Sequence, residues 1–544
     1  MFVIAMQSIK YSSAPGPDGV PAFLYRKYAE ELATPLKLLW QMSFDSGVMP
    51  EPTLLAHITP ILKSVDRSIP ANYRPVSLTN HLTKIFERVI RQEIVHHLET
   101  NGLMNNTQHG FRERYSTITE ILSFYDSVLT FLEEGHAVDA IYLDFAKAFD
   151  KVDHQILLKK AESVGITGNL LRWIRTFLTN RQQQVRVGNV LSSKEWVRSG
   201  VPQGSVLGPL LFLIMLLDID KDVKFSMIGS YADDTRLWRF IHGDGDQELL
   251  QRDLGVLYEW AVANNKAFND LKFEYLAMGE PSNRTYTTPS GLVIKKKQHV
   301  KDLGVYMSND CSFDYHIAAC AKSASQVSAW ILRTFLSRDK FVLKVLLKSL
   351  LVPKCEYASV VWSPFDNKNI NMLENIQRRF TSRIIDYQVW DEELQMWHCN
   401  VSYADRLKDL QIYSLERRRE RVMILYAYRV VIGLMAFNWF EAFEDRGSIK
   451  LRSRYNNRAP VRVRRSRHSS FFYKGPQLYN LLPSELQQFE EIDSPHKSHV
   501  DAFKVELDKY LMKIPDVPTV GGSPRTAATN SLICQIPLYR RQNP

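Results

Sequence analysis

Ser230-Tyr231-Ala232-Asp233-Asp234-Thr235 is the stretch on which the fold and function of this chain depend. It lies between two short apolar runs, Phe225–Ile228 and Leu237–Ile241, and such runs joined by a tight polar link predict a β-hairpin. Two adjacent carboxylates at the turn would repel each other unless a cation neutralised them. Mg²⁺ is a hard ion that prefers carboxylate oxygen. The stretch is therefore either a metal site or an ordinary acidic hairpin turn.

The composition is typical of a globular intracellular protein with an anionic partner. The chain has 544 residues, 45% hydrophobic and 24% charged, and this length predicts about two to four domains. Its formal net charge of +10 favours a polyanionic partner. The five cysteines form no Cys-x-x-Cys pair, so neither a disulfide framework nor a zinc site is indicated. No apolar run is long enough to cross a bilayer, so no membrane association is expected.

A further acid follows a predicted buried strand. Val138–Leu143 is mostly apolar, and Asp144 comes directly after it. A buried acid is costly if it is unpaired, and strand ends are where α/β-type folds gather ligands. Asp150 and Asp153 have a simpler explanation, because either can cap the helix expected to run to Gly165.

Basic residues and a glycine-rich loop mark possible sites for a phosphate-bearing ligand. Lys63 ends a strand-like run, and Arg74 lies on the next extended segment. Both could reach one phosphate group, or both are solvated surface charges. Ser199–Pro209 contains three glycines and two prolines ahead of an apolar helix. Such a loop lets a ligand approach the backbone closely, although a purely structural loop has the same composition.

The C-terminal half is predicted to be mostly helical and basic. His316–Ile385 and Ala404–Leu434 contain recurring Lys and Arg, which fit either a groove for a nucleic-acid backbone or a solvated helical face. Lys450–Arg467 is the most basic run, and nuclear import, RNA binding and surface solvation are all open for it. Val517–Pro544, rich in Pro, Gly, Ser and Thr, is expected to be disordered.

Several motifs in order along the chain resemble those of reverse transcriptases. Tyr231–Asp234 resembles their catalytic box, Leu143–Asp150 their first acidic motif, and Ser199–Pro209 their nucleotide-binding Pro-Gln-Gly motif. The resemblance is narrowed to non-LTR (LINE-type, jockey-like) retrotransposon polymerases by Gly16–Gly19, Tyr73–Leu78, Gln108–Arg112 and Asp302–Val305. It covers about Ser13 to Met307 and continues more loosely through Arg383 and the Tyr403–Leu434 block. The opening stretch is therefore interpreted as part of a metal site.

This resemblance implies an α+β (mixed) right-hand polymerase with fingers, a palm of antiparallel sheet plus helices, a helical thumb and a mostly helical C-terminal region. The expected divisions are an N-terminal remnant (1–12), fingers and palm (13–285), a helical thumb or connection (286–385), a basic C-terminal region (386–514) and a disordered tail (515–544). The family's usual N-terminal endonuclease is not expected, because the polymerase motifs begin close to Met1. No ribonuclease H block is evident, so a polymerase fragment is expected.

The resemblance also implies an activity and a set of site residues. An RNA-directed DNA polymerase transfers a nucleotide from a dNTP to a DNA primer 3′-hydroxyl on an RNA template, using two Mg²⁺ ions, for which Mn²⁺ is an alternative. Asp144 and Asp233 would be the main metal ligands, with the carbonyl of Phe145 and a less direct Asp234. Lys272 would be the general acid for pyrophosphate. The implied substrate-binding residues are Lys63 and Arg74 at the triphosphate, Phe149 as a steric gate against the ribose 2′-hydroxyl, Gln203 and Gly204 under the incoming base and template, and Tyr231.

Two other functions are weighed against this one. The chain could be a catalytically inactive, truncated relic that only binds nucleic acid, but the three acids and Lys272 favour an active enzyme. It could be an RNA-dependent RNA polymerase, but Phe149 argues against ribonucleotides. The family's way of life implies action in the nucleus.

Overall fold

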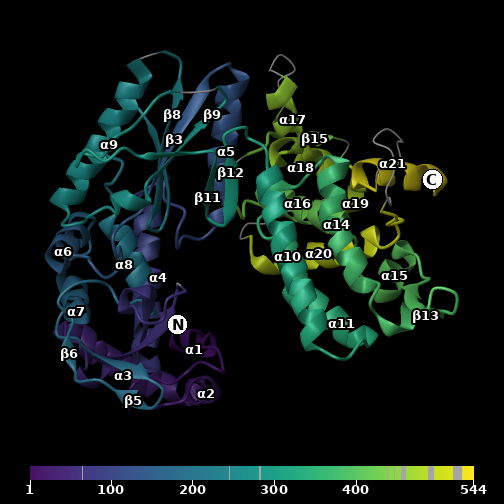
Figure 1. The fold of residues 1–544 in the computed structure, drawn as a ribbon. Helices are drawn as coiled ribbons and strands as arrows, with labels where there is room; N and C mark the ends of the chain where they lie inside the picture. The colour runs from purple at the N-terminus through teal and green to yellow at the C-terminus, as the bar shows by residue number, and fades with distance from the viewer. Residues whose placement is uncertain are drawn as a thin grey trace.

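The computed structural model describes every residue except 64, 244, 281–282, 438, 446, 455–460, 488–494, 519–529 and 544. Figure 1 shows two bodies side by side: an N-terminal one that holds the larger sheets and a C-terminal one that is mostly helical. This mixture confirms the predicted fold class. The helices of the first body are α1 (Phe2–Gln7), α2 (Ala22–Lys27), α3 (Ala29–Ser46), α4 (His81–Thr100), α5 (Thr117–Glu133), α6 (His154–Ser163), α7 (Gly168–Leu178), α8 (Gly208–Met215) and α9 (Gly245–Ala263).

A five-stranded sheet carries the predicted hairpin. Its order is β10 (Lys295–Lys297), β9 (Glu274–Met278), β3 (Ala137–Leu143), β8 (Asp234–Ile241) and β7 (Met227–Tyr231). The central strand β3 is antiparallel to both of its neighbours, and its residues are buried except for the half-buried Tyr142. Strands β7 and β8 form a hairpin in which Tyr231 pairs with Asp234. The predicted hairpin and the predicted buried strand are both confirmed, and this sheet corresponds to the expected palm.

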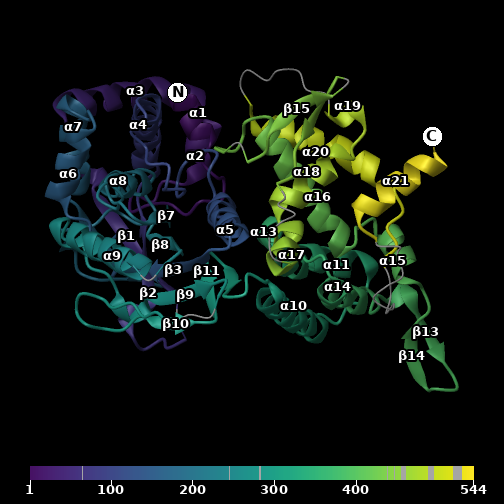
Figure 2. The same cartoon turned by 90° about the horizontal axis from the view of Figure 1, so that it is seen from above.

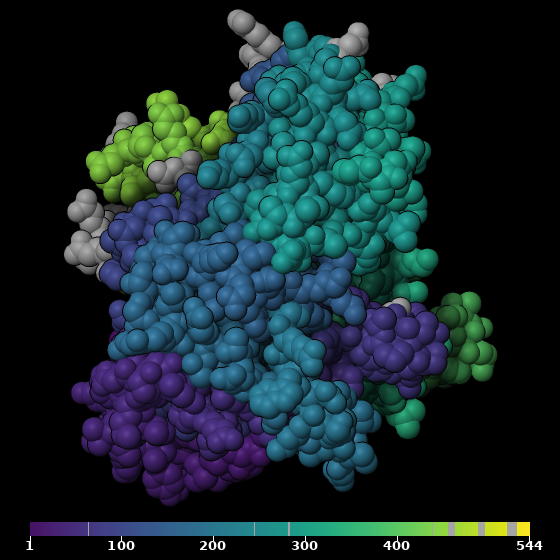
Figure 3. All heavy atoms as spheres, turned by 90° about the vertical axis from the view of Figure 1, so that its left-hand side faces the viewer, coloured from purple at the N-terminus to yellow at the C-terminus, as the bar shows by residue number. Residues whose placement is uncertain are grey.

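A second sheet lies at the other end of the N-terminal body. Strand β1 (Leu55–Leu62) is antiparallel to β2 (Tyr73–Leu78) and parallel to β4 (Gln182–Val187), which also pairs with β5 (Val190–Leu191) and β6 (Glu195–Trp196). Figure 3 shows the purple N-terminal residues forming one continuous surface with the blue residues beside them. Helix α1 contributes buried Ala5 and Met6 to a small core with α2, α3 and α4. Residues 1–12 therefore pack into this lobe, and their interpretation as an N-terminal remnant stays a prediction.

The palm extends past the predicted boundary at residue 285. Strand β10 pairs with β9, and buried Tyr286 packs against Tyr275. A further hairpin is formed by β11 (His299–Asp302) and β12 (Val305–Ser308). Its two-residue turn places both Leu303 and Gly304 at positive φ, of 43° and 92°, and the leucine conceals a turn that glycine normally signals.

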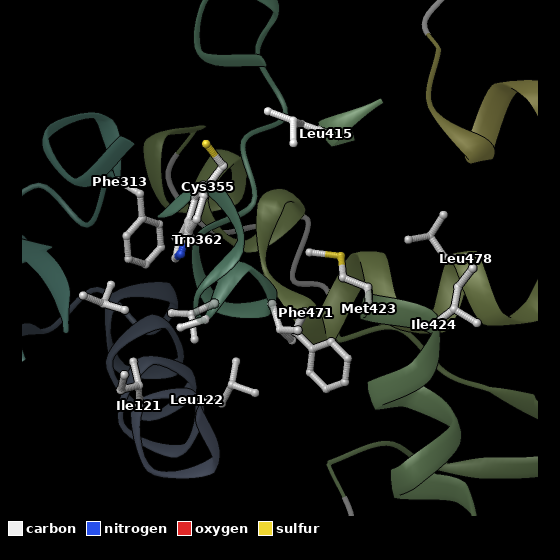
Figure 4. Close-up of a cluster of buried hydrophobic side chains, with 14 of the residues drawn as sticks. Ile121, Leu122, Phe313, Cys355, Trp362, Leu415, Met423, Ile424, Phe471 and Leu478 are labelled. Carbon is white, nitrogen blue, oxygen red and sulfur yellow. The ribbon is translucent and has the colours of Figure 1, made fainter. Parts of the chain in front are cut away.

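The C-terminal body is organised around one apolar core. Its helices are α10 (Asp314–Thr334), α11 (Lys340–Leu346), a π-helical turn (Leu347–Leu351), α12 (Val352–Glu356), α13 (Ser359–Trp362), α14 (Asn367–Thr381), α15 (Tyr403–Leu410), α16 (Leu415–Val431), α17 (Val461–Ser469), α18 (Phe471–Asn480), α19 (Ser484–Gln487), α20 (Lys497–Leu511) and α21 (Leu532–Gln542). Figure 4 shows Ile121 and Leu122 of α5 in the same cluster as Trp362 and Phe471. Among the described residues, apolar side chains on both sides of the predicted boundary at residue 385 belong to this one core.

The C-terminal body also contains two short hairpins: β13 (Gln388–Asp391) with β14 (Met396–Cys399), and β15 (Ala442–Asp445) with β16 (Ser448–Leu451). Figure 2 shows the first of them projecting away from the helices. Among the described residues, no helix has the length and apolar character needed to span a membrane.

Parts of the basic run and of the tail are packed against the rest of the chain. Arg467 is 1% exposed and forms ion pairs with Asp126 (2.6 Å) and Glu133 (2.7 Å) of α5, so this part of the run ties the two bodies together. Within the tail, α21 buries Leu532 and Ile536, which overturns the prediction of disorder for that segment. Arg458 and residues 519–529 lie outside the described residues.

Candidate active site

The turn of the β7–β8 hairpin is held from outside by a side chain of another segment. Ala232 has a φ of 59°, a left-handed conformation that costs an ordinary residue about 1–2 kcal/mol. The Gln108 amide offsets this strain, because its oxygen accepts a hydrogen bond from the Ala232 N–H (2.8 Å) and its nitrogen donates to the Ala232 carbonyl (3.1 Å). Asp233, next in the turn, is thereby fixed in place.

The register of the sheet brings Asp144 to this turn. Leu143 pairs with Thr235 across β3 and β8, so the next step along the ladder places Asp144 opposite Asp234. The Asp144 carbonyl accepts a hydrogen bond from the Asn269 N–H at 2.8 Å. The Asp144 carboxylate accepts one from Lys272 Nζ, also at 2.8 Å. Lys272 lies at the end of a short 3₁₀ turn (Asp270–Lys272) and is more than half exposed. Asp144 and Lys272, two of the four predicted catalytic residues, therefore meet at one end of the sheet.

The carboxylates at this end of the sheet raise one another's affinity for protons. Loss of surrounding water raises the pKa of Asp234 to about 6, and the charges of Asp233, Asp302 and Asp144 add to the effect. Burial also raises the pKa of Asp233, with a contribution from Asp144 that Arg74 and Lys272 partly offset. The cluster therefore holds an excess of negative charge. Within the described residues, however, no group of three or more His, Cys, Asp or Glu side chains is arranged to hold a metal ion.

The predicted gate and the Pro-Gln-Gly loop lie next to each other. The Phe149 ring stacks on Phe212 of α8 with centroids 4.4 Å apart. Gln203 donates to the Asp150 carboxylate at 2.8 Å, and its carbonyl accepts from the Ser77 N–H at 2.6 Å. Gly204 has a φ of 117°, and a Cβ there would lie 2.6 Å from the Ser77 carbonyl oxygen, so only glycine fits this approach of the loop to β2.

The two basic residues of the fingers are exposed at the end of the β1–β2 pair. Arg74 pairs with Ile61 across the strands, and Lys63 follows two residues later, where side chains return to the same face. Arg74 also acts on the pKa of Asp233. The structure therefore connects Arg74 to the acids electrostatically, whereas Lys63 lies farther along the same face.

The two remaining predicted residues differ in their surroundings. Phe145 is buried, stacks on Phe268 at 4.5 Å, and forms an isolated bridge with it. Tyr231 is half-buried, and its pKa is raised by burial and by Tyr357 of the helical body. Tyr357 in turn donates to the Leu303 carbonyl at 2.8 Å, so the β11–β12 hairpin and the helical body both border the site.

Sequence reasoning missed two buried groups that support the site. Glu87 of α4 accepts hydrogen bonds from the Val206 and Leu207 N–H groups, at 2.6 and 2.8 Å, and so fixes the end of the Pro-Gln-Gly loop. Arg236 of β8 forms buried ion pairs with Glu120 and Asp302. These charges occur in ordinary-looking helix and strand segments, so no local signal distinguished them from surface residues.

A cavity of about 170 Å³ lies between the acids at the end of the palm sheet and the ion pairs of Arg236. Its lining includes Asp144, Asp234, Lys272, Arg236 and Asp302. The reactive end of the sheet and the buried ion pairs thus share one space.

Part of the chain is similar to a known protein family. Residues 61–307 match the family described as reverse transcriptase (RNA-dependent DNA polymerase). The chain is 28% identical over 380 residues to the probable RNA-directed DNA polymerase from transposon X-element of Drosophila melanogaster, covering 65% of this chain and 40% of that protein. It is 27% identical over 405 residues to the RNA-directed DNA polymerase from mobile element jockey of Drosophila funebris, covering 70% and 43%.

The likeness extends into the helical body. The probable RNA-directed DNA polymerase from transposon BS of Drosophila melanogaster is 24% identical over 445 residues, which cover 79% of this chain and 48% of that protein. The chain thus spans less than half the length of each of these relatives. On these matches, residues 61–307 are similar to the reverse transcriptase family, and the chain is similar to RNA-directed DNA polymerases of transposons and mobile elements.

Proposed function

We propose that this chain is an RNA-directed DNA polymerase that extends a DNA primer on an RNA template with dNTPs. The observation that carries the proposal is the meeting of Asp144, Asp233 and Asp234 at one end of the palm sheet, with Lys272 2.8 Å from Asp144. Carboxylates that repel one another at a cleft are typical of a site built to receive cations.

The donor set fits Mg²⁺. Asp144 and Asp233 offer carboxylate oxygens, and burial together with neighbouring acids raises the pKa of Asp233 and of Asp234. Mg²⁺ is commonly held by one or two carboxylates, with substrate phosphates and water completing its shell, so a preformed cage of three side chains is not needed. Asp144 and Asp233 would be the main ligands, with the Phe145 carbonyl and Asp234 assisting. When bound, two such ions would activate the primer hydroxyl and neutralise the triphosphate, a role that Mn²⁺ could also serve.

The other site residues would bind and orient the nucleotide. Arg74 and Lys63 present positive charge on one face of the β1–β2 pair, where they could hold a triphosphate. Lys272 has an exposed ammonium group and could give a proton to the departing pyrophosphate. Gln203 and Gly204 would lie beneath the incoming base and the template, close to Tyr231. The ring of Phe149 would exclude a ribose 2′-hydroxyl.

Primer extension tests the proposal directly. With poly(rA)/oligo(dT), dTTP and Mg²⁺, the wild-type chain is expected to incorporate nucleotide, and Asp144→Asn is expected to remove incorporation without lowering the melting temperature. Absence of incorporation by the wild type, or equal incorporation by the variant, would identify the chain as an inactive nucleic-acid-binding relic. Preference for rUTP on the same template would instead identify an RNA polymerase. Action on chromosomal DNA in the nucleus belongs to the same proposal.

A further inference from the structure

A buried lysine lies behind the metal-ligand segment, and neither the motifs nor the proposed chemistry uses it. Lys266 is 7% exposed, and its ammonium donates a hydrogen bond to the Ala148 carbonyl at 2.7 Å. Burial lowers the pKa of Lys266 to about 8, although the charges of Asp233 and Asp150 partly counteract this effect. Burying an ammonium is costly when an apolar side chain would fill the same space. A positional role would justify that cost.

Lys266 is the first residue of a short segment, 266–269, that runs beside the loop after β3. The Ala146 N–H donates to the Ala267 carbonyl at 2.9 Å, and the Asn269 N–H donates to the Asp144 carbonyl at 2.8 Å. Lys147, which follows Ala146 in the loop, has a φ of 54°. The chain turns sharply at Lys147. The hydrogen bond from Lys266 to the Ala148 carbonyl therefore contacts the loop on the far side of that turn.

The same ammonium also lies against the support of the Phe149 ring. Lys266 Nζ is 5.5 Å from the centroid of Phe212, and Phe149 stacks on Phe212 at an interplanar angle of 16°. Lys266 therefore contacts the peptide that enters Phe149 and the ring on which Phe149 rests. Moving this one group would shift the gate from two sides.

We propose that Lys266 is a positioning residue that fixes the Phe149 ring and thereby sets the discrimination between deoxyribonucleotides and ribonucleotides. The inference rests on the proposed polymerase function and on Phe149 as the gate. Discrimination by a ring against one hydroxyl depends on ring placement, and misplacement by about 1 Å can change rates by up to about 10²-fold. A residue without contact to the nucleotide can therefore control sugar selection.

The test compares Lys266→Met with Lys160→Met in the full chain. Lys160 is the control, since its ammonium also donates to a carbonyl (Met215, 2.8 Å) and lies 4.9 Å from an aromatic centroid (Trp260). It pairs with Asp218, and neither the Ala148 carbonyl nor the Phe212 ring is its partner. The kcat/KM values for dTTP and rUTP are measured on poly(rA)/oligo(dT), with the melting temperature of each variant. For Lys266→Met we expect the dTTP/rUTP ratio to fall about tenfold, through better use of rUTP, while dTTP use changes less than about threefold. Lys160→Met is expected to keep the wild-type ratio.

Each other outcome overturns the inference in an identifiable way. An unchanged ratio in an active Lys266→Met protein shows that the lysine does not position the gate. An equal loss of dTTP and rUTP use, or failure of the variant to fold, assigns Lys266 a purely structural role. An equal fall in ratio for Lys160→Met shows that any loss of a buried ammonium has the same effect. A wild type that uses dTTP keeps the proposed function regardless, and one that uses neither nucleotide removes both proposals.

Discussion

Two groups of carboxylates, one around Arg236 and one around Asp234 of strand β8, differ in how far a cation neutralises them. Arg236 is buried and forms ion pairs with Glu120 and Asp302. Asp234 lies two residues earlier on the strand, and the pKa of its carboxyl is raised to about 6 by loss of surrounding water and by neighbouring acids. Residues two apart on a strand share a face, so the contrast does not arise from their place in the sheet.

The contrast separates charges that hold the fold from charges that are reserved for ligands. Around Arg236, each acid has its cation within the protein, so the cluster is complete without a ligand. Around Asp234, the exposed Lys272 is paired with only Asp144, and repulsion persists. A protein keeps such unfavourable pairs where function needs them. Four experiments test whether the two groups of charges differ in this way.

The largest expected effect is that of Asp233→Asn on catalysis. We expect incorporation of dTTP to fall about 10³-fold or more, as for loss of an essential charged group, and the melting temperature without metal to rise because a repelling charge is removed. Glu120→Gln is the matched control from the other cluster and should lower the melting temperature, because it weakens a buried ion pair with Arg236. Primer extension and thermal melting measure the two quantities, and a loss of stability in Asp233→Asn would erase the contrast.

The next effect concerns stability alone. Arg236→Met leaves the buried carboxylates of Glu120 and Asp302 without their cation, so the free energy of unfolding should fall by about 3–5 kcal/mol. Urea unfolding followed by tryptophan fluorescence measures it. Adding Glu120→Gln and Asp302→Asn to Arg236→Met should restore much of the loss, because no unpaired charge then remains. A loss below about 1 kcal/mol for the single variant would place these ion pairs with ordinary surface pairs.

A smaller effect is expected for the lysine of the reactive cluster. Lys272→Met should lower kcat about 10²-fold, the usual scale of general acid catalysis, with a smaller change in the KM for dTTP. Steady-state primer extension separates the two constants. A rise in KM at constant kcat would mean that Lys272 only binds the nucleotide.

The smallest effect is a pH dependence of stability in the absence of divalent metal. The pKa of Asp234 is about 6 in the folded chain, above its usual value of 3.8, so the folded state binds this proton more tightly than the unfolded state. Its contribution to stability is present below about pH 4 and is lost as the pH rises through 6. The melting temperature of Asp234→Asn, minus that of the wild type, should therefore increase between pH 4 and 6 and then level off. A constant difference would contradict the raised pKa.

Local sequence patterns were sufficient for the elements that carry the acids. Apolar runs on either side of Tyr231–Asp234 predicted the hairpin, and the run before Asp144 predicted a buried strand, because strand patterns depend on near neighbours. Sequence patterns were not sufficient for two other elements. The turn between β11 and β12 was not predicted, because leucine is unusual at a turn position. Helix α21 was not predicted, because the composition of the tail is polar.

The acids and bases, and the strands and turns on which they lie, follow from the order of residues along the chain. Which of those charges are neutralised depends on how the strands and helices pack. Gln108 holds Ala232, Arg467 pairs with Asp126, and Lys266 reaches Ala148, each across a long stretch of chain. The physical reason is that pairing and desolvation depend on distance in space, which register and packing set and which local composition does not encode.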